Sequence, residues 1–204
     1  MYVDITQLDP QQIYITLTQT VIPRPIAWVL SENANGSLNL APYSFFNAVS
    51  SDPALVMIST GLNPDGRPKD TRENIKQRRD FLVHIASVAQ LEELNASSAT
   101  LPAGESEVDH LGLTTVPLAG SRLPRLKDAK VAFVCTLYEI HNIGENTTSM
   151  ILGRVSGVYL DDEVVGHDAK GRRQIYADRI HPLGRLGASE YVDFGRMIKL
   201  KRPA

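Results

Sequence analysis

The sequence predicts a mainly β fold, a closed or partly closed barrel that carries a few short helices. Apolar stretches of strand length recur along the 204 residues, whereas helical spacing is confined to two short stretches. Strands and helices do not alternate regularly, which argues against a parallel α/β architecture. No segment has the composition of a linker between parts that stand alone, so we expect one domain over residues 1–204.

The composition excludes several classes of function. Apolar residues make up 43% of the chain and charged residues 22%, and the formal net charge is −2, so no global field attracts nucleic acid or an anionic membrane. No apolar run is long enough to span a bilayer. A lone cysteine, Cys135, cannot form an internal disulfide. The first residues include Asp4 and show no basic region followed by an apolar run, so no signal peptide is expected. We therefore expect a cytoplasmic protein that binds neither nucleic acid nor membranes.

The first strands are predicted near the N-terminus. Ile26–Leu30 leads through a turn at Glu32–Ser37 into Leu38–Ala41. The turn contains Asn35-Gly36, a pair that tolerates positive φ and favours a tight connection between two strands.

The later strands follow from short apolar runs and from alternation. The longest begins at Lys130, where both faces are apolar and burial on both sides is expected, and becomes polar near Glu139 and His141. A turn at Asp161-Asp162 is expected to precede the last strand. The predicted strands are Leu55–Thr60, Phe81–Ala86, Lys130–Ile143, Met150–Leu160 and Glu163–Gly166.

Two helices are predicted. Asp70–Arg79 begins with Asp70 as the expected N-cap and has Glu73 three residues later, as in a capping box. Ser87–Ser97 spaces its apolar residues at helical intervals. Gly, Pro and Ser recur in Leu101–Leu126, which we interpret as a long surface loop.

The start of the first predicted helix is a candidate anion site. Main-chain N–H groups and the helix dipole favour an anion there. Lys69 adds a charge, Thr71 a hydroxyl and Asn74 an amide one turn further on. The alternative is that Asp70 caps the helix, competes for the same N–H groups, and leaves Lys69 solvated.

The segment Ala41–Asn47 (APYSFFN) is a candidate wall for a flat aromatic ligand. Such a ligand needs polar contacts at one edge, which Ser44 offers, and apolar contacts elsewhere, which Phe45, Phe46 and Trp28 offer. Aromatic residues near a strand end are more often part of the core, and the residues alone favour that alternative.

Other chemistries have weaker support. Arg24 and Arg185 are polar candidates, the second in a glycine-rich segment with His181 and Tyr191, but a solvated arginine in a surface turn explains them equally well. The five histidines show no metal-binding spacing. The sequence contains neither a nucleophile elbow nor a dinucleotide-binding glycine motif.

Taken in order, the segments IPRPIAWVLS, NGSLNLAPYSFFNAVSSDPALVMIST, KDTRENI, FLVHI and HPLGRLGASEYV resemble the flavin reductase-like family of FMN-binding split barrels. This family includes flavoredoxins and the reductase components of two-component monooxygenases. The resemblance extends over nearly the whole chain and is weakest at Leu101–Leu126 and Asp162–Arg179. It implies a split β-barrel that binds FMN non-covalently, usually at a homodimer interface.

The resemblance also implies roles for individual residues. Asn39–Asn47 would line the isoalloxazine, with Trp28 beside it, and Arg185 would approach from the C-terminal segment. Asp70 would cap its helix next to the phosphate without binding it. The residues implied to form the FMN site are Trp28, Asn39, Ala41, Ser44, Phe45, Phe46, Asn47, Ser59, Thr60, Lys69, Asp70, Thr71, Asn74 and Arg185.

The activity implied is reduction of flavin by NADH or NADPH, with hydride passing to flavin N5 and reduced flavin supplied to a partner monooxygenase. Because the cofactor carries this chemistry, no residue is predicted to be catalytic. Two alternatives remain: an FMN-binding electron carrier similar to flavoredoxin, and a barrel that has lost its ligand and serves as a binding module.

Overall fold

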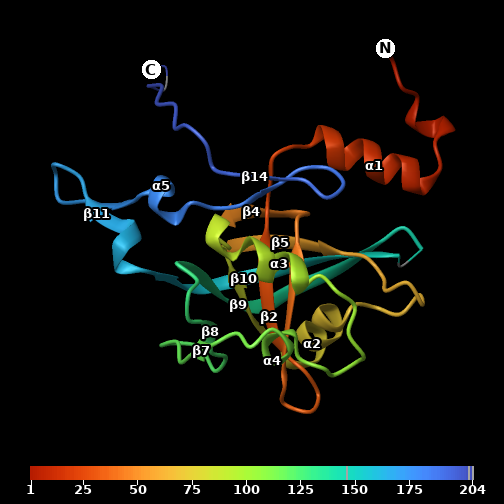
Figure 1. Ribbon diagram of the computed structural model, residues 1–204, viewed down its shortest axis with the longest axis horizontal. Coiled ribbons are helices and arrows are strands. Elements are labelled where there is room, and N and C mark those ends of the chain that lie inside the picture. The colour runs from red at the N-terminus through yellow and green to blue at the C-terminus, as the bar shows by residue number, and fades with distance from the viewer. Residues whose placement is uncertain (146, 202, 204) are drawn as a thin grey trace.

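A curled seven-stranded antiparallel sheet forms the centre of the molecule (Figure 1). The computed structural model describes residues 1–145, 147–201 and 203. The strand order is β3-β2-β6-β9-β10-β5-β4. The strands are β2 (Ala27–Glu32), β3 (Leu38–Tyr43), β4 (Phe46–Ser51), β5 (Ala54–Thr60), β6 (Asp80–His84), β9 (Val131–Ile143) and β10 (Thr148–Leu160).

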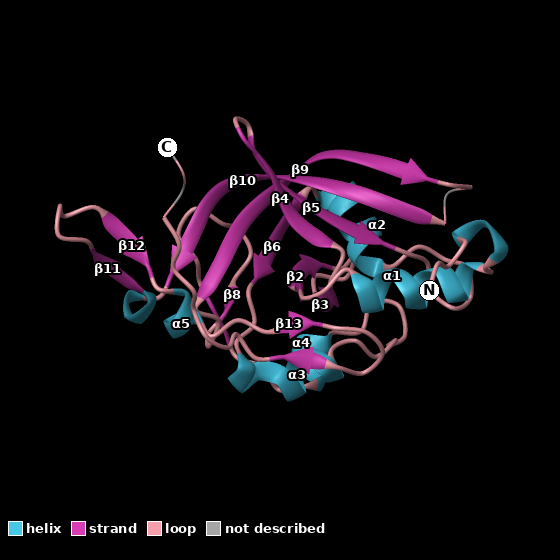
Figure 2. Cartoon of the chain, turned by 90° about the horizontal axis from the view of Figure 1, so that it is seen from above, coloured by secondary structure: helices cyan, strands magenta, loops and turns pink. Residues whose placement is uncertain are grey.

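The two edge strands of this sheet, β3 and β4, are consecutive in the sequence and are joined only by Ser44 and Phe45. Because five strands separate them in the sheet, the sheet must curl until its edges meet at this linker, and Figure 2 shows that curvature. Within the described residues β3 and β4 do not pair with each other, so the barrel is open along a seam. The Ser59 N–H donates to the Phe45 carbonyl at 2.8 Å and fixes the linker against β5.

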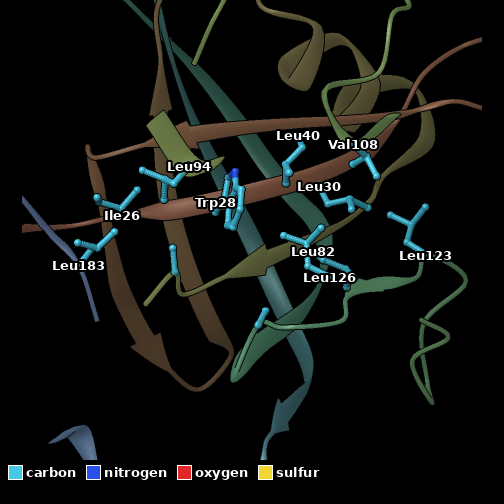
Figure 3. Close-up of a cluster of buried hydrophobic side chains, with 12 residues drawn as sticks. Ile26, Trp28, Leu30, Leu40, Leu82, Leu94, Val108, Leu123, Leu126 and Leu183 are labelled. Carbon is cyan, nitrogen blue, oxygen red and sulfur yellow. The ribbon is translucent and has the colours of Figure 1, made fainter. Parts of the chain in front are cut away.

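The core lies on both faces of β2. Trp28 and Leu30 point into one cluster of buried side chains, and Ala27 and Val29 point into another, as the alternation along a strand requires. Figure 3 shows Trp28 in the middle of the first cluster. The Trp28 side chain has no exposed surface.

Helices and small sheets surround the barrel. The α-helices are α1 (Pro10–Thr20), α2 (Asp70–Arg78), α3 (Leu91–Ala96), α4 (Glu107–His110) and α5 (Ala177–Ile180), with 3-10 helices at Ile5–Gln7, Val88–Gln90 and Asp162–Val164. The small sheets are β1 (Arg24–Pro25) with β13 (Gly184–Arg185) and β14 (Tyr191–Val192), β7 (Thr115–Val116) with β8 (Arg125–Leu126), and β11 (Val165–His167) with β12 (Arg173–Ile175). No helix in the described part of the chain is long and apolar enough to cross a membrane.

The predicted strands of the barrel are confirmed, with small differences at their ends. The turn between the first two is also confirmed, and Gly36 takes the positive φ of 87°. The last predicted strand, Glu163–Gly166, is wrong in part. Asp161 caps a 3-10 helix that covers Asp162–Val164, and β11 begins only at Val165.

Three predictions about the remaining elements need correction. Lys69 is the N-cap of α2 and Asp70 is its first helical residue, so Asp70 does not cap the helix. The stretch Ser87–Ser97 is a capped 3-10 turn followed by the short α3. Leu101–Leu126 is not simply a surface loop, because it contains α4, β7 and β8 and buries Val108.

Helix α1 was not predicted. A capping box between Asp9 and Gln12 starts it, and Pro10 occupies its first turn. Only Thr18 of this helix is buried, and the helix lies outside the barrel (Figure 1).

Candidate functional site

A network of buried amides and hydroxyls closes the end of the barrel next to α2. The Asn39 side-chain amide donates to Thr71 Oγ1 at 2.8 Å and to Ser31 Oγ at 3.3 Å. The Asn74 amide donates to the same serine at 3.2 Å and to Asn33 Oδ1 at 2.8 Å. Buried polar groups that satisfy one another in this way hold a single arrangement. The network fixes the first turns of α2 against β2 and β3.

The N-terminus of α2 is open. Lys69 is the N-cap, but no side chain of the described residues caps the helix, so its first N–H groups have no side-chain acceptor among them. This end of the helix borders a cavity of about 90 Å³. Its lining comprises Asn39, Ala41, Pro42, Tyr43, Asn63, Lys69, Asp70, Thr71, Ser97, Ser98, Ala99, Thr100, Leu101 and Glu107.

Two carboxyl groups share this polar cavity with Lys69. Asp70 lies in the first turn of α2. Glu107 is 8% exposed, and its Oε2 accepts the main-chain N–H of Leu40 at 2.8 Å. Burial raises the pKa of Glu107 and also that of the neighbouring Tyr43 phenol, whereas the bond from Leu40 opposes the shift at Glu107. The cavity therefore has N–H donors and the Asp70 carboxyl group at the helix end, and a second carboxyl group from Glu107.

A larger apolar cavity, of about 500 Å³, lies at the seam of the barrel. It contains five of the residues predicted to contact flavin: Ser44, Phe45, Phe46, Asn47 and Ser59. Leu17, Val21, Pro23, Arg24, Pro25, Met57, Ile143 and Met150 complete its lining. The seam thus places an apolar surface and a few polar groups where the two edge strands meet, as a pocket for a flat ring requires.

Thr60, at the end of β5, carries a buried hydroxyl that has no hydrogen-bond partner among the described residues. Thr60 is 1% exposed. An unpaired buried hydroxyl costs about 1–3 kcal/mol, so such groups are rare and require an explanation. Thr60 borders neither the polar nor the apolar cavity.

The structure thus distributes most of the predicted residues between the polar cavity and the apolar cavity. Asn39, Ala41, Lys69, Asp70 and Thr71 border the polar cavity, and Ser44–Asn47 with Ser59 border the apolar one.

Four predicted residues lie elsewhere, and Thr60, described above, is one of them. The Trp28 indole is in the core and donates to Ser97 Oγ at 2.8 Å, a position that favours the core interpretation. The Asn74 amide is used within the buried network. Arg185 borders a third cavity, beneath α1.

Several residues of the polar cavity were not predicted as site residues. Tyr43 lies inside the predicted segment Ala41–Asn47, so the sequence signal for it was present. Glu107 and the stretch 97–101 carry no motif, and only the fold brings them to the helix end.

The family of the chain follows from its sequence taken as a whole. Residues 19–178 match the model of the flavin reductase like domain. The chain belongs to this family. The predicted resemblance and the split-barrel fold are both confirmed.

Relatives of this flavin reductase-like protein cover its full length. The uncharacterized protein YwrF of Bacillus subtilis is 37% identical over 203 residues, 97% of each chain. The structure of nitrilotriacetate monooxygenase component B from Bacillus cereus superposes with a TM-score of 0.89 at 30% identity, over 98% of both chains. The 2-nitrobenzoate 2-nitroreductase NbaA of Pseudomonas fluorescens has a TM-score of 0.88 at 31% identity, over 100% of this chain and 96% of its own.

Proposed function

We propose that this chain is a homodimeric FMN-dependent oxidoreductase, acting as one domain over its whole length, that reduces its flavin with NADH or NADPH. Bound FMN would supply the redox chemistry by accepting hydride at N5. The observation that carries the proposal is the open N-terminus of α2 beside Lys69, in a chain of the flavin reductase-like family.

The residues at the end of the barrel suit a phosphate and the sugar-like chain attached to it. Lys69 supplies a positive charge, and the uncapped first turn of α2 supplies N–H donors. Ser59 and Thr60 offer hydroxyls for polyol oxygens, and the Thr60 hydroxyl has no other partner among the described residues. The Asn39 amide nitrogen is used within the buried network, so Asn39 offers only its Oδ1 as an acceptor. Since Asp70 does not cap the helix, it does not compete for the N–H groups as a cap would.

The seam suits the flavin ring. The linker Ser44-Phe45 and the adjacent Phe46 and Asn47 border the apolar cavity, where they bind one edge of a ring and exclude water from it. The tasks assigned to these residues are binding, orientation and exclusion of water, so no acid, base or nucleophile is required of the chain.

Exposed apolar side chains beside the seam support a homodimer. Leu17 is 44% exposed, Val21 58%, Phe45 39%, Val49 54% and Ile143 50%. Four of these residues also border the apolar cavity, so a second copy seated here covers both the apolar patch and the bound ring. Light scattering in solution is expected to give twice the mass of one chain, and a monomer would contradict the dimer.

The likeness to nitrilotriacetate monooxygenase component B supports a role in supplying reduced flavin to a partner monooxygenase. An electron carrier that receives electrons from another protein is the alternative. The two roles differ in the rate at which reduced nicotinamide bleaches the bound flavin, and in turnover with excess free flavin.

Substitution at the helix end tests the FMN site. Lys69→Ala removes a charge near the phosphate and is expected to weaken FMN binding at least tenfold, since a bond to a charged group contributes about 1.5–3 kcal/mol. Thr71→Ala is expected to weaken it severalfold. Lys76→Ala, an exposed lysine at the other end of α2, is the matched control and should bind FMN as the wild type does. Unchanged affinity in both test variants, measured by quenching of FMN fluorescence, would refute the phosphate assignment.

A further inference from the structure

Two arginines face each other across the short β1–β13 ladder. Arg24 and Arg185 are directly opposite partners in the register of these antiparallel strands. Like charges in opposite positions destabilise a strand pair. Arg24 is also only 5% exposed, and neither side chain forms an ion pair with a carboxylate of the described residues. The fold therefore concentrates positive charge here without neutralising it.

Neutral acceptors satisfy part of the hydrogen-bonding capacity of Arg24. Its Nη1 donates to the carbonyls of Thr18 and Val21, its Nη2 to the Leu186 carbonyl at 2.8 Å, and its Nε to Ser44 Oγ at 3.3 Å. A guanidinium has five N–H donors, so one donor on Nη2 remains. These bonds hold the group in place, but none of the acceptors carries a negative charge.

Arg185 forms fewer hydrogen bonds with the described residues than Arg24 does. Its Nη1 donates to the main-chain carbonyl of Glu190 at 2.9 Å, not to the carboxylate, and its Nη2 donates to the carbonyl of Ala188. Its guanidinium stacks over the Tyr191 ring at 4.4 Å from the centroid. Three N–H donors of this positioned guanidinium have no acceptor among the described residues.

A cavity of about 320 Å³ lies between the two arginines and α1. The helix contributes polar side chains, and the glycine-rich loop after β13 approaches it so closely that a Cβ on Gly187 would lie 2.4 Å from Gln19 Cγ. The lining comprises Gln11, Tyr14, Ile15, Thr18, Gln19, Arg24, Arg185, Leu186 and Ala188. This cavity contains hydrogen-bond donors, two positive charges and no carboxylate.

Arg24 joins this cavity to the apolar cavity at the seam, because it borders both. Its guanidinium lies 6.0 Å from the centroid of the Phe45 ring, and the Tyr14 and Phe45 rings are 6.3 Å apart. An anion between the arginines is thus adjacent to the apolar surface assigned to the flavin ring. Lys69 and the open end of α2 border a different cavity, so the two arginines and Lys69 place positive charge at two separate cavities.

We propose that Arg24 and Arg185 bind the diphosphate of the reduced nicotinamide dinucleotide, and so hold its nicotinamide at the seam. This inference rests on the proposed function. It assigns Arg185 to the reductant and not to FMN. A diphosphate carries two negative charges, which match the two arginines, and its oxygens accept several N–H bonds from them.

Binding of ADP-ribose to the FMN-loaded protein tests the site without turnover. This probe contains the diphosphate but transfers no hydride. Calorimetry is expected to show binding that weakens with salt, at least tenfold weaker binding in Arg185→Gln, and intermediate binding in Arg185→Lys, which keeps the charge but not the planar fork. Arg173→Gln removes a charge from an exposed site on β12 and should match the wild type. No binding by the wild type, or equal binding by Arg185→Gln, would overturn the proposal.

Anaerobic flavin reduction separates this inference from the proposed function. The donors are NADH and 1-benzyl-1,4-dihydronicotinamide, which has no phosphate. Arg185→Gln is expected to lower the ratio of the NADH rate to the benzyl compound rate at least tenfold. If both donors reduce the flavin and this ratio is unchanged, the diphosphate site is wrong and the reductase stands. If neither donor reduces the flavin of the wild type, the reductase activity and the reductant site are both refuted. The FMN site is tested separately, by the affinity of the protein for FMN.

Discussion

His84 makes the stability of the fold depend on pH in a calculable way. The ring is fully buried, with Nδ1 at 3.2 Å from the Trp28 carbonyl and Nε2 at 3.1 Å from the Leu126 main-chain nitrogen. Because the Leu126 N–H donates to Nε2, the ring is neutral and Nδ1 carries the proton that it shares with the carbonyl. Burial, aided by the charge of Arg125 and opposed by the bond to Trp28, lowers the His84 pKa from 6.5 to about 4.

The sign of the effect follows from proton linkage. Between its unfolded pKa of 6.5 and its folded pKa of about 4, His84 binds a proton in the unfolded chain and not in the folded one. The free energy of unfolding is therefore highest above the unfolded pKa and falls as the pH falls toward the folded pKa. One pKa unit corresponds to about 1.4 kcal/mol, so acidification from about pH 7 to about pH 4.5 removes ~2.5 kcal/mol through His84.

Urea unfolding over this pH range measures the effect. His84→Gln keeps an amide donor and acceptor but does not titrate. On acidification its free energy of unfolding is expected to fall by ~2.5 kcal/mol less than that of the wild type. Other titrating groups, such as Glu107, contribute equally to both proteins. His167→Gln, at an exposed histidine, should lose as much as the wild type. Equal losses in the wild type and His84→Gln would refute the reasoning.

Two further predictions concern packing and the core hydrogen bond. A Cβ at Gly153 would lie 2.5 Å from Phe81 Cζ, so Gly153→Ala is expected to lower the free energy of unfolding by about 1–3 kcal/mol. Gly157→Ala, with its nearest contact at 3.8 Å, should change it by less than about 0.5 kcal/mol, and equal effects in urea unfolding would contradict the packing account. Ser97→Ala leaves the Trp28 indole N–H without its acceptor and is expected to cost about 1–3 kcal/mol; an unchanged melting temperature would show that the bond contributes nothing.

The barrel was predictable because its strands carry their own signal. β9 and β10 are long runs in which apolar residues predominate, and the structure gives nearly the predicted bounds. Helix α1 lacks such a signal. Its residues Tyr14 and Leu17 are exposed, so the helix has no buried face that would give a periodic apolar pattern. Its capping residues were the signal that the sequence did contain.

The segment Leu101–Leu126 shows what depends on tertiary contacts. Its content of Gly, Pro and Ser does indicate irregular backbone, but it does not reveal that Leu123 and Leu126 enter the core. The bond from the Leu126 N–H to His84 joins positions 42 residues apart and has no local signature.

The candidate site likewise combines residues that have a local sequence signal with residues that only the fold brings together. Lys69 and Thr71 were predictable because a helix start has a local pattern, although the assignment of its cap was one residue off. Glu107 reaches the same cavity through a contact with Leu40, 67 residues away, which no spacing rule foresees. The pairing of Arg24 with Arg185 likewise exists only in the folded strand ladder.

The central claim is that this flavin reductase-like chain binds FMN and reduces it with a nicotinamide. The most direct test is the visible absorption spectrum of the purified protein reconstituted with FMN and followed anaerobically as NADH or NADPH is added. We expect FMN to stay with the protein and its absorption to bleach rapidly. Protein-bound flavin that stays oxidised would contradict the reductase and favour the electron carrier, and a protein that takes up no FMN would contradict the account as a whole.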